Sequence, residues 1–182
     1  MSGRDVVAIF GAGPIGAATI VMAKAMGARV IAVDVLQSRV AFARGLGADY
    51  VIDGSKTDAV KEILSVSGGF GADAAIDTSG SAQGQLGALE CTRYLGQVAF
   101  VGLNRKDLLI QPLRHVNERQ LTIHGSVIYG IDEFEEIGLF VVNQKAPIEK
   151  IVSDVCRVAD AGKAFAMFDT AQSAGKIVFE WE

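Results

Sequence analysis

The sequence has few of the residues from which metal centres and disulfide frameworks are built. Its 182 residues include only two cysteines, two histidines and three prolines. Cys91 and Cys156 stand far apart and fit neither a disulfide framework nor the short ligand spacing of a zinc site, so each is interpreted as a small core residue. His115 is expected in a loop and His124 in a strand rather than at a metal. We therefore expect no metal site and no catalytic residue in this chain, and a reducing cytoplasm as its compartment.

Basic charge and long apolar runs are also scarce. The chain carries 17 Lys and Arg against 21 Asp and Glu, for a net charge of −4, and has no basic cluster. Nucleic acid and anionic membranes are therefore poor candidate partners. No apolar run approaches the roughly 20 residues of a membrane helix. The N-terminus has no hydrophobic signal region before the first apolar segment.

Glycine and aliphatic residues are abundant, and the most informative of them lie between residues 6 and 16. An apolar, β-branched run enters a Gly-x-Gly-x-x-Gly turn, and a helix of small residues follows over 17–26. In such a turn the glycines allow a tight bend, the approach of a pyrophosphate and close packing of helix on strand. The helix N-terminus then offers N–H groups to phosphates, and a proline suits its first turn. The cofactor-binding residues predicted here are Gly11, Gly13, Pro14, Ile15 and Gly16.

An acidic residue supports a dinucleotide ligand and indicates which one. A second apolar strand over 29–33 ends at Asp34, about where the carboxylate of a dinucleotide-binding fold accepts hydrogen bonds from the ribose. A carboxylate at this point would repel a 2′-phosphate, which predicts NAD rather than NADP. Arg39 could partly offset that repulsion, or it could cover the adenine.

Strand-like and helix-like segments alternate along residues 1–145. This alternation predicts an α/β Rossmann fold with a doubly wound, six-stranded parallel sheet. Within it we expect a capping box at Ser55 and Asp58 and a helix over 82–94. Residues 146–182 are expected to form a strand–helix–strand tail that packs on a part of the protein absent from this sequence.

Taken in order, these motifs resemble the C-terminal, nucleotide-binding half of the zinc-dependent medium-chain alcohol and polyol dehydrogenases. The resemblance rests on residues 11–16, 33–39, 47–49, 77–80, 101–103, 124–126 and 164–178. It implies that Asp34 holds the adenosine ribose, with Arg39 beside the ribose and adenine. It further implies a cleft lined by Thr78 and Ser79, a nicotinamide bordered by Val101, Gly102, Leu103 and Ser126, and a pyrophosphate contacted by Lys176.

The other half of that family, a GroES-like catalytic domain with the zinc ligands, is absent from this sequence. In the parent enzyme, the resemblance implies, zinc assists hydride transfer between an alcohol and NAD. We expect this chain to bind the cofactor and to be inactive alone. A non-catalytic dinucleotide-sensing module is the alternative, although such a module does not need the returning tail. A short-chain dehydrogenase is set aside because no Tyr-x-x-x-Lys pair is present.

The resemblance also implies a homodimer formed through the open edge of the sheet. The segments concerned are Leu108–Ile110 and Leu121–His124. An edge strand presents unpaired N–H and C=O groups that invite a partner, and a two-fold pairing would join two sheets. The alternative is a monomer with an edge kept solvated by Lys106, Asp107, Arg114 and Arg119.

Overall fold

The computed structural model describes residues 2–181 and contains a six-stranded sheet in which every neighbouring pair is parallel. The strand order is β3-β2-β1-β4-β5-β6. The strands are β1 (Val6–Phe10), β2 (Arg29–Asp34), β3 (Tyr50–Asp53), β4 (Ala72–Asp77), β5 (Thr92–Phe100) and β6 (Thr122–Gly125). Because β1 is the first strand and the chain winds outward on both sides of it, the expected doubly wound Rossmann fold is confirmed.

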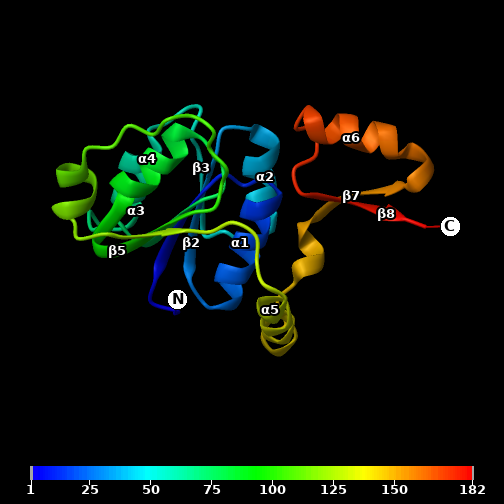
Figure 1. Cartoon of the computed structure of the whole chain (residues 1–182), viewed down its shortest axis with the longest axis horizontal. Helices are drawn as coiled ribbons and strands as arrows, with labels where there is room; N and C mark the ends of the chain where they lie inside the picture. The colour runs from blue at the N-terminus through cyan, green and yellow to red at the C-terminus, as the bar shows by residue number, and fades with distance from the viewer. Residues whose placement is uncertain (1, 182) are drawn as a thin grey trace.

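Two pairs of helices cover the two faces of this sheet (Figure 1). On one face α1 (Pro14–Ala25) and α2 (Gln37–Gly45) pack in a cluster with Val7 and Ile9. On the other, α3 (Ala59–Val66) and α4 (Ala82–Cys91) pack in a cluster with Ala8 and Phe10. All five residues of β1 are buried, as expected for a strand covered on both faces.

The remaining elements follow β5 and β6. A π-helical turn, η1 (Leu113–Asn117), lies in the connection between those two strands. After β6 come α5 (Ile131–Gln144), the 3₁₀ turn η2 (Ile148–Ile151), β7 (Val152–Arg157), the 3₁₀ turn η3 (Val158–Asp160), α6 (Ala161–Asp169) and β8 (Lys176–Glu180). Strands β7 and β8 form a separate parallel pair, which lies with α6 beyond α2 in Figure 1. This arrangement is the strand–helix–strand tail that the sequence predicts.

Two local expectations are wrong. The helix expected over 82–94 ends at Cys91, and Thr92 already pairs with Ala72 of β4. The side chain of Arg119 donates hydrogen bonds to the carbonyl oxygens of Leu89, Glu90 and Thr92, and so replaces the N–H groups of a further helical turn.

The capping box expected at Ser55 and Asp58 is also absent. Asp58 alone caps α3, accepting a hydrogen bond from the Lys61 N–H at 3.2 Å. Ser55 donates instead to the Asp53 carboxylate at 2.5 Å. The Ser55 hydroxyl therefore stabilises the turn after β3 and does not cap α3, because the Asp53 carboxylate competes for it.

Candidate nucleotide-binding site

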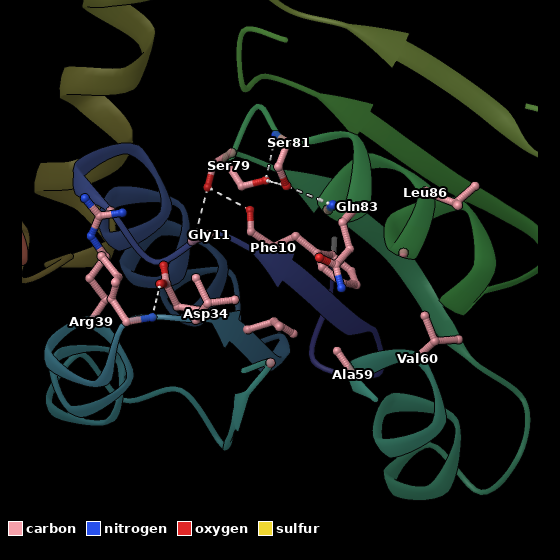
Figure 2. A pocket seen from close by; sticks show the side chains of 18 of the residues that line it. Phe10, Gly11, Asp34, Arg39, Ala59, Val60, Ser79, Ser81, Gln83 and Leu86 are labelled. Carbon is pink, nitrogen blue, oxygen red and sulfur yellow. Dashed lines mark hydrogen bonds between the residues drawn. The ribbon is translucent and has the colours of Figure 1, made fainter. Parts of the chain in front are cut away.

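A cavity of about 810 Å³ opens at the carboxyl ends of β1 and β2. Its walls are the turn between β1 and α1, the inner side of α2, the first turn of α3, the loop after β4 and one face of α4. Figure 2 shows side chains from these elements pointing into it. Strands β1 and β4 are neighbours whose following connections lead to opposite faces of the sheet, which makes this a topological switch point where ligands of open α/β sheets bind.

Close backbone contacts require glycine at two of the three glycine positions of the turn. Gly11 has φ +91°, and a Cβ there would lie 2.8 Å from the Ser79 N atom. A Cβ on Gly16 would overlap the carbonyl oxygen of Gly11. Thr78 holds the turn from the neighbouring strand, since its hydroxyl donates to the Gly11 carbonyl at 2.7 Å. Gly13 differs from both, because its φ of −68° suits any residue and its site has room for a Cβ.

Asp34 connects the end of β2 to the glycine turn. It is 7% exposed, and its Oδ2 atom accepts a hydrogen bond from the Ala12 N–H at 2.7 Å. Its Oδ1 atom accepts a second one from the Leu36 N–H at 2.9 Å. Each carboxylate oxygen has two lone pairs, so Asp34 can accept further bonds from hydroxyls in the cavity that it lines.

Asp77 gives the loop after β4 its shape. Its carboxylate is fully buried and accepts hydrogen bonds from the Ser79 hydroxyl at 2.6 Å, the Ser79 N–H at 3.1 Å and the Gly80 N–H at 3.2 Å. Burial raises the pKa of Asp77, and the hydrogen bonds from Ser79, Gly80 and Gln85 oppose that rise. Asp77 therefore positions Thr78 and Ser79, which line the cavity, without facing it.

Arg39 is the single cationic side chain among the described residues that line the cavity. Its guanidinium lies beside Gly13, where a Cβ would be 3.4 Å from the Cζ and Nη1 atoms. The Nε atom is buried and has no hydrogen-bond partner among the described residues.

The predicted cofactor-binding residues fall into two groups. The first group lines the cavity or supports its turn: Gly11, Gly13, Pro14, Ile15, Gly16, Asp34, Arg39, Thr78 and Ser79. The second group lies outside the cavity lining: Val101, Gly102, Leu103, Ser126 and Lys176.

Four of these five residues nevertheless lie just after β5 or β6, at the same carboxyl ends of the strands as the cavity. The N–H groups of Val101 and Gly102 both donate to the Asp77 carbonyl at 2.9 Å, and the Ser126 N–H donates to the Phe100 carbonyl at 3.0 Å. Lys176 instead begins β8 in the separate two-stranded sheet.

The cavity also has an apolar half that the sequence analysis did not identify. Val60 of α3 and Leu86 of α4 line it together with Phe10 (Figure 2). The polar side chains of Gln83 and Glu90 line the cavity from the same helix. Positions 83, 86 and 90 are spaced along one face of a helix. That spacing could have indicated from the sequence that these residues line a cavity, but a helix that only packs on a sheet shows the same spacing.

The residues of this chain do not fit the zinc site of the family that the motifs resemble. A catalytic zinc requires three protein ligands, and no group of three His, Cys, Asp or Glu side chains able to hold a metal occurs within residues 2–181. Burial raises the pKa of the Cys91 thiol to about 12. The Nδ1 atom of His115 accepts a hydrogen bond from the Gln111 N–H at 3.0 Å.

Within residues 2–181, no helix is long and apolar enough to span a membrane.

Comparisons with known proteins agree with this architecture. The zinc-binding dehydrogenase family model matches residues 14–143. D-xylulose reductase A of Aspergillus niger is 31% identical over 168 residues, covering 90% of this chain and 46% of that protein. An NAD-dependent alcohol dehydrogenase of Sulfurisphaera tokodaii is 31% identical over 181 residues, covering 96% and 50%. The crystal structure of 2R,3R-butanediol dehydrogenase from Bacillus subtilis superposes with a TM-score of 0.87 at 28% identity, covering 100% of this chain and 52% of that one.

This chain therefore spans about half the length of the curated relatives that it matches. The family expected from the motifs is confirmed by a match over most of the Rossmann domain. This chain belongs to the zinc-binding dehydrogenase family.

Proposed function

We propose that this chain is the NAD(H)-binding half of a zinc-dependent alcohol or polyol dehydrogenase. The observation that carries the proposal is the cavity in which the glycine turn, the N-terminus of α1 and the Asp34 carboxylate meet. Phosphates bind at such helix ends and ribose hydroxyls at such carboxylates. The names of two relatives, an NAD-dependent alcohol dehydrogenase and a xylulose reductase, support the same class of reaction.

Asp34 supports NAD over NADP as the cofactor. Its carboxylate is buried and accepts two backbone hydrogen bonds, so it is held in place at the end of β2. A 2′-phosphate brought beside it would meet a fixed negative charge, whereas a 2′-hydroxyl would donate to it. Bound NAD would supply the hydride acceptor, and this chain would hold and orient it.

The nicotinamide end is proposed to lie at the carboxyl ends of β5 and β6. Val101, Gly102 and Leu103 follow β5, and Ser126 follows β6. Since the described residues hold no zinc ligand set, the zinc of the proposed enzyme would be bound by protein outside this chain. Alcohol chemistry is then expected only when both halves are present.

A sheet-edge homodimer and a reducing, cytoplasmic compartment belong to the same proposal. Strand β6 is the last in the sheet order, and its four residues are exposed. Leu109, in the segment before η1, is 89% exposed. The two thiols, Cys91 and Cys156, are unpaired, which suits a reducing compartment.

Titration with NADH tests the cofactor proposal directly. Wild-type protein should enhance and shift NADH fluorescence, and Gly13→Val should abolish the change. Valine is compatible with the Gly13 backbone but fills the approach to the phosphates. Circular dichroism and thermal unfolding of Gly13→Val should match the wild type. Equal NADH titration curves for the two proteins would refute the assignment.

A further inference from the structure

The loops that follow β4 and β5 lie backbone against backbone. A Cβ on Gly102 would overlap the Gly80 N atom, and a Cβ on Gly80 would lie 2.8 Å from the Leu103 carbonyl oxygen. The Val101 and Gly102 N–H groups both donate to the Asp77 carbonyl. Residues on both sides of Gly80 line the nucleotide cavity, whereas none of the lining residues belongs to the loop after β5. The second loop is therefore aligned with the cavity wall without forming part of it.

A chain of side-chain hydrogen bonds joins the same two loops through α4. Gln85 is 6% exposed, and its side chain forms a hydrogen bond with the Asp77 carboxylate. The Oε1 atom of Gln85 accepts a hydrogen bond from the Nδ2 atom of Asn104 at 3.0 Å. The Oδ1 atom of Asn104 in turn accepts one from the Lys106 N–H at 2.8 Å. One buried amide thus connects the carboxylate that shapes the first loop to the residue that turns the second.

The burial of Gln85 fixes the direction of these hydrogen bonds. A buried amide needs partners for both its NH₂ group and its carbonyl oxygen. An ionised carboxylate only accepts hydrogen bonds, so Gln85 turns its NH₂ group toward Asp77 and leaves its oxygen for Asn104. Asn104 must then direct its own NH₂ group at Gln85 and its oxygen at the Lys106 N–H. The Asn104 side chain therefore has a single orientation that satisfies all of its partners.

We propose that Gln85 and Asn104 are positioning residues that hold the loop after β5 where the nicotinamide of the dinucleotide would rest. The proposal rests on the function proposed above, which places the nicotinamide beside this loop. Leu103 is 71% exposed and lies between two attachment points. One is the packing of Gly102 on Gly80, and the other is the Asn104 hydrogen bond. Neither Gln85 nor Asn104 lines the cavity, so both act through the loop and not on the cofactor.

The test compares a ligand that carries the nicotinamide with one that lacks it. Dissociation constants for NADH and ADP-ribose are measured by calorimetry on the wild type, Gln85→Met, Asn104→Asp and the double variant. Gln85→Met keeps the length of the side chain but removes its hydrogen-bonding groups. Asn104→Asp keeps the acceptor for the Lys106 N–H but removes the donor to Gln85. Asn143→Asp is the matched control, because it adds the same charge at an exposed position on α5.

Each single variant should weaken NADH roughly twofold to tenfold, the range for one lost neutral hydrogen bond. ADP-ribose affinity should be unchanged, because Asp77 keeps its three hydrogen bonds from Ser79 and Gly80. The double variant should bind NADH no more weakly than the weaker single variant, since both changes break the same link. Asn143→Asp should bind both ligands as the wild type does.

Three results would overturn the role given to Gln85 and Asn104. Equal losses for NADH and ADP-ribose would show a general disturbance of the cavity, and unchanged NADH affinity would show that the loop does not depend on the link. Losses that multiply in the double variant would show that the two side chains act separately. A wild type that binds neither ligand would instead refute the proposed function. Thermal unfolding checks the variants, and Asn104→Asp, in a half-buried loop, decides the matter if Gln85→Met does not fold.

Discussion

Two carboxylates flank β1 at its carboxyl end, and their hydrogen bonds give them different roles. Both carboxylate oxygens of Asp77, the last residue of β4, accept hydrogen bonds from Ser79 and Gly80 in the loop that follows. Asp34 on β2 holds the glycine turn through Ala12 and also lines the cavity. Asp34 alone of the two can therefore discriminate between ligands, whereas Asp77 supports the wall opposite it.

Replacing Asp34 with alanine should change the choice of cofactor as well as its affinity. Asp34→Ala removes the acceptor for the ribose hydroxyls and the charge that repels a 2′-phosphate. NADH binding should weaken by about 1–3 kcal/mol, the range for a hydrogen bond to a charged group, and the preference for NADH over NADPH should narrow. Fluorescence titrations with both cofactors measure the two effects. Asp53→Ala is the control, because Asp53 ends the neighbouring strand outside the cavity lining. An unchanged NADH-to-NADPH ratio in Asp34→Ala would contradict the role given to Asp34.

At the residue scale, the sequence predicted the position of residues whose place depends on the strand pattern. Gly11 follows β1 and Asp34 ends β2, and that pattern placed both of them at the carboxyl ends of the strands. The direction of Arg39 could not be predicted in the same way. A long side chain on a helix can extend in several directions, and the packing of the Arg39 guanidinium beside Gly13 is a tertiary contact that no local pattern encodes.

Helix α1 and helix α5 show how the same residue type serves different elements. Gly16 in α1 packs directly beneath the Gly11 carbonyl, whereas a Cβ on Gly138 in α5 would meet no atom within 4 Å beyond its own helix. The sequence pattern could not separate these glycines, because the difference arises from the approach of the turn to α1. For the same reason, the end of α4 at Cys91 depends on Arg119, a residue distant in sequence.

Alanine at these two glycines should shift the stability in opposite directions. Gly16→Ala should lower the free energy of unfolding by about 1–3 kcal/mol, because the added methyl group is forced against backbone. Gly138→Ala should raise it by about 0.5–1 kcal/mol through helix propensity alone. Urea unfolding followed by circular dichroism measures both. A destabilised Gly138→Ala protein would mean that α5 makes contacts at this position that the fold does not show.

At the scale of the molecule, the tail packs on the Rossmann domain yet leaves much apolar surface exposed. Ala146 is buried in the cluster of α1 and α2, and the turn before β8 approaches Phe42, as a Cβ on Gly175 would lie 2.8 Å from that ring. Phe165 and Phe168 of α6 are more than half exposed. The sequence predicted these elements from their patterns. Their packing on α2 depends on tertiary contacts that no local pattern encodes.

The 182-residue chain alone should reduce no NAD with any alcohol or polyol, with or without added zinc. The described residues provide a cavity for the dinucleotide but no set of three metal ligands. Absorbance at the NADH band during incubation with NAD and a panel of alcohols and polyols measures turnover. Elemental analysis measures zinc content, which should be below one equivalent. Turnover that survives repurification would show that the chain carries a catalytic site of its own.

Leu109→Asp should convert the proposed sheet-edge dimer into a monomer. Leu109 is 89% exposed, whereas its neighbour Ile110 packs partly against the core, so a charge at Leu109 affects the surface without damaging the interior. An exposed apolar segment beside the edge strand β6 is the arrangement that a second copy would cover. Sedimentation velocity at micromolar concentration should give a dimer for the wild type and a monomer for Leu109→Asp. Phe70→Asp is the control, because Phe70 is also apolar and 81% exposed but lies in the loop between α3 and β4, and this variant should stay dimeric. A monomeric wild type, or a dimer that persists in Leu109→Asp, would exclude this edge as the interface.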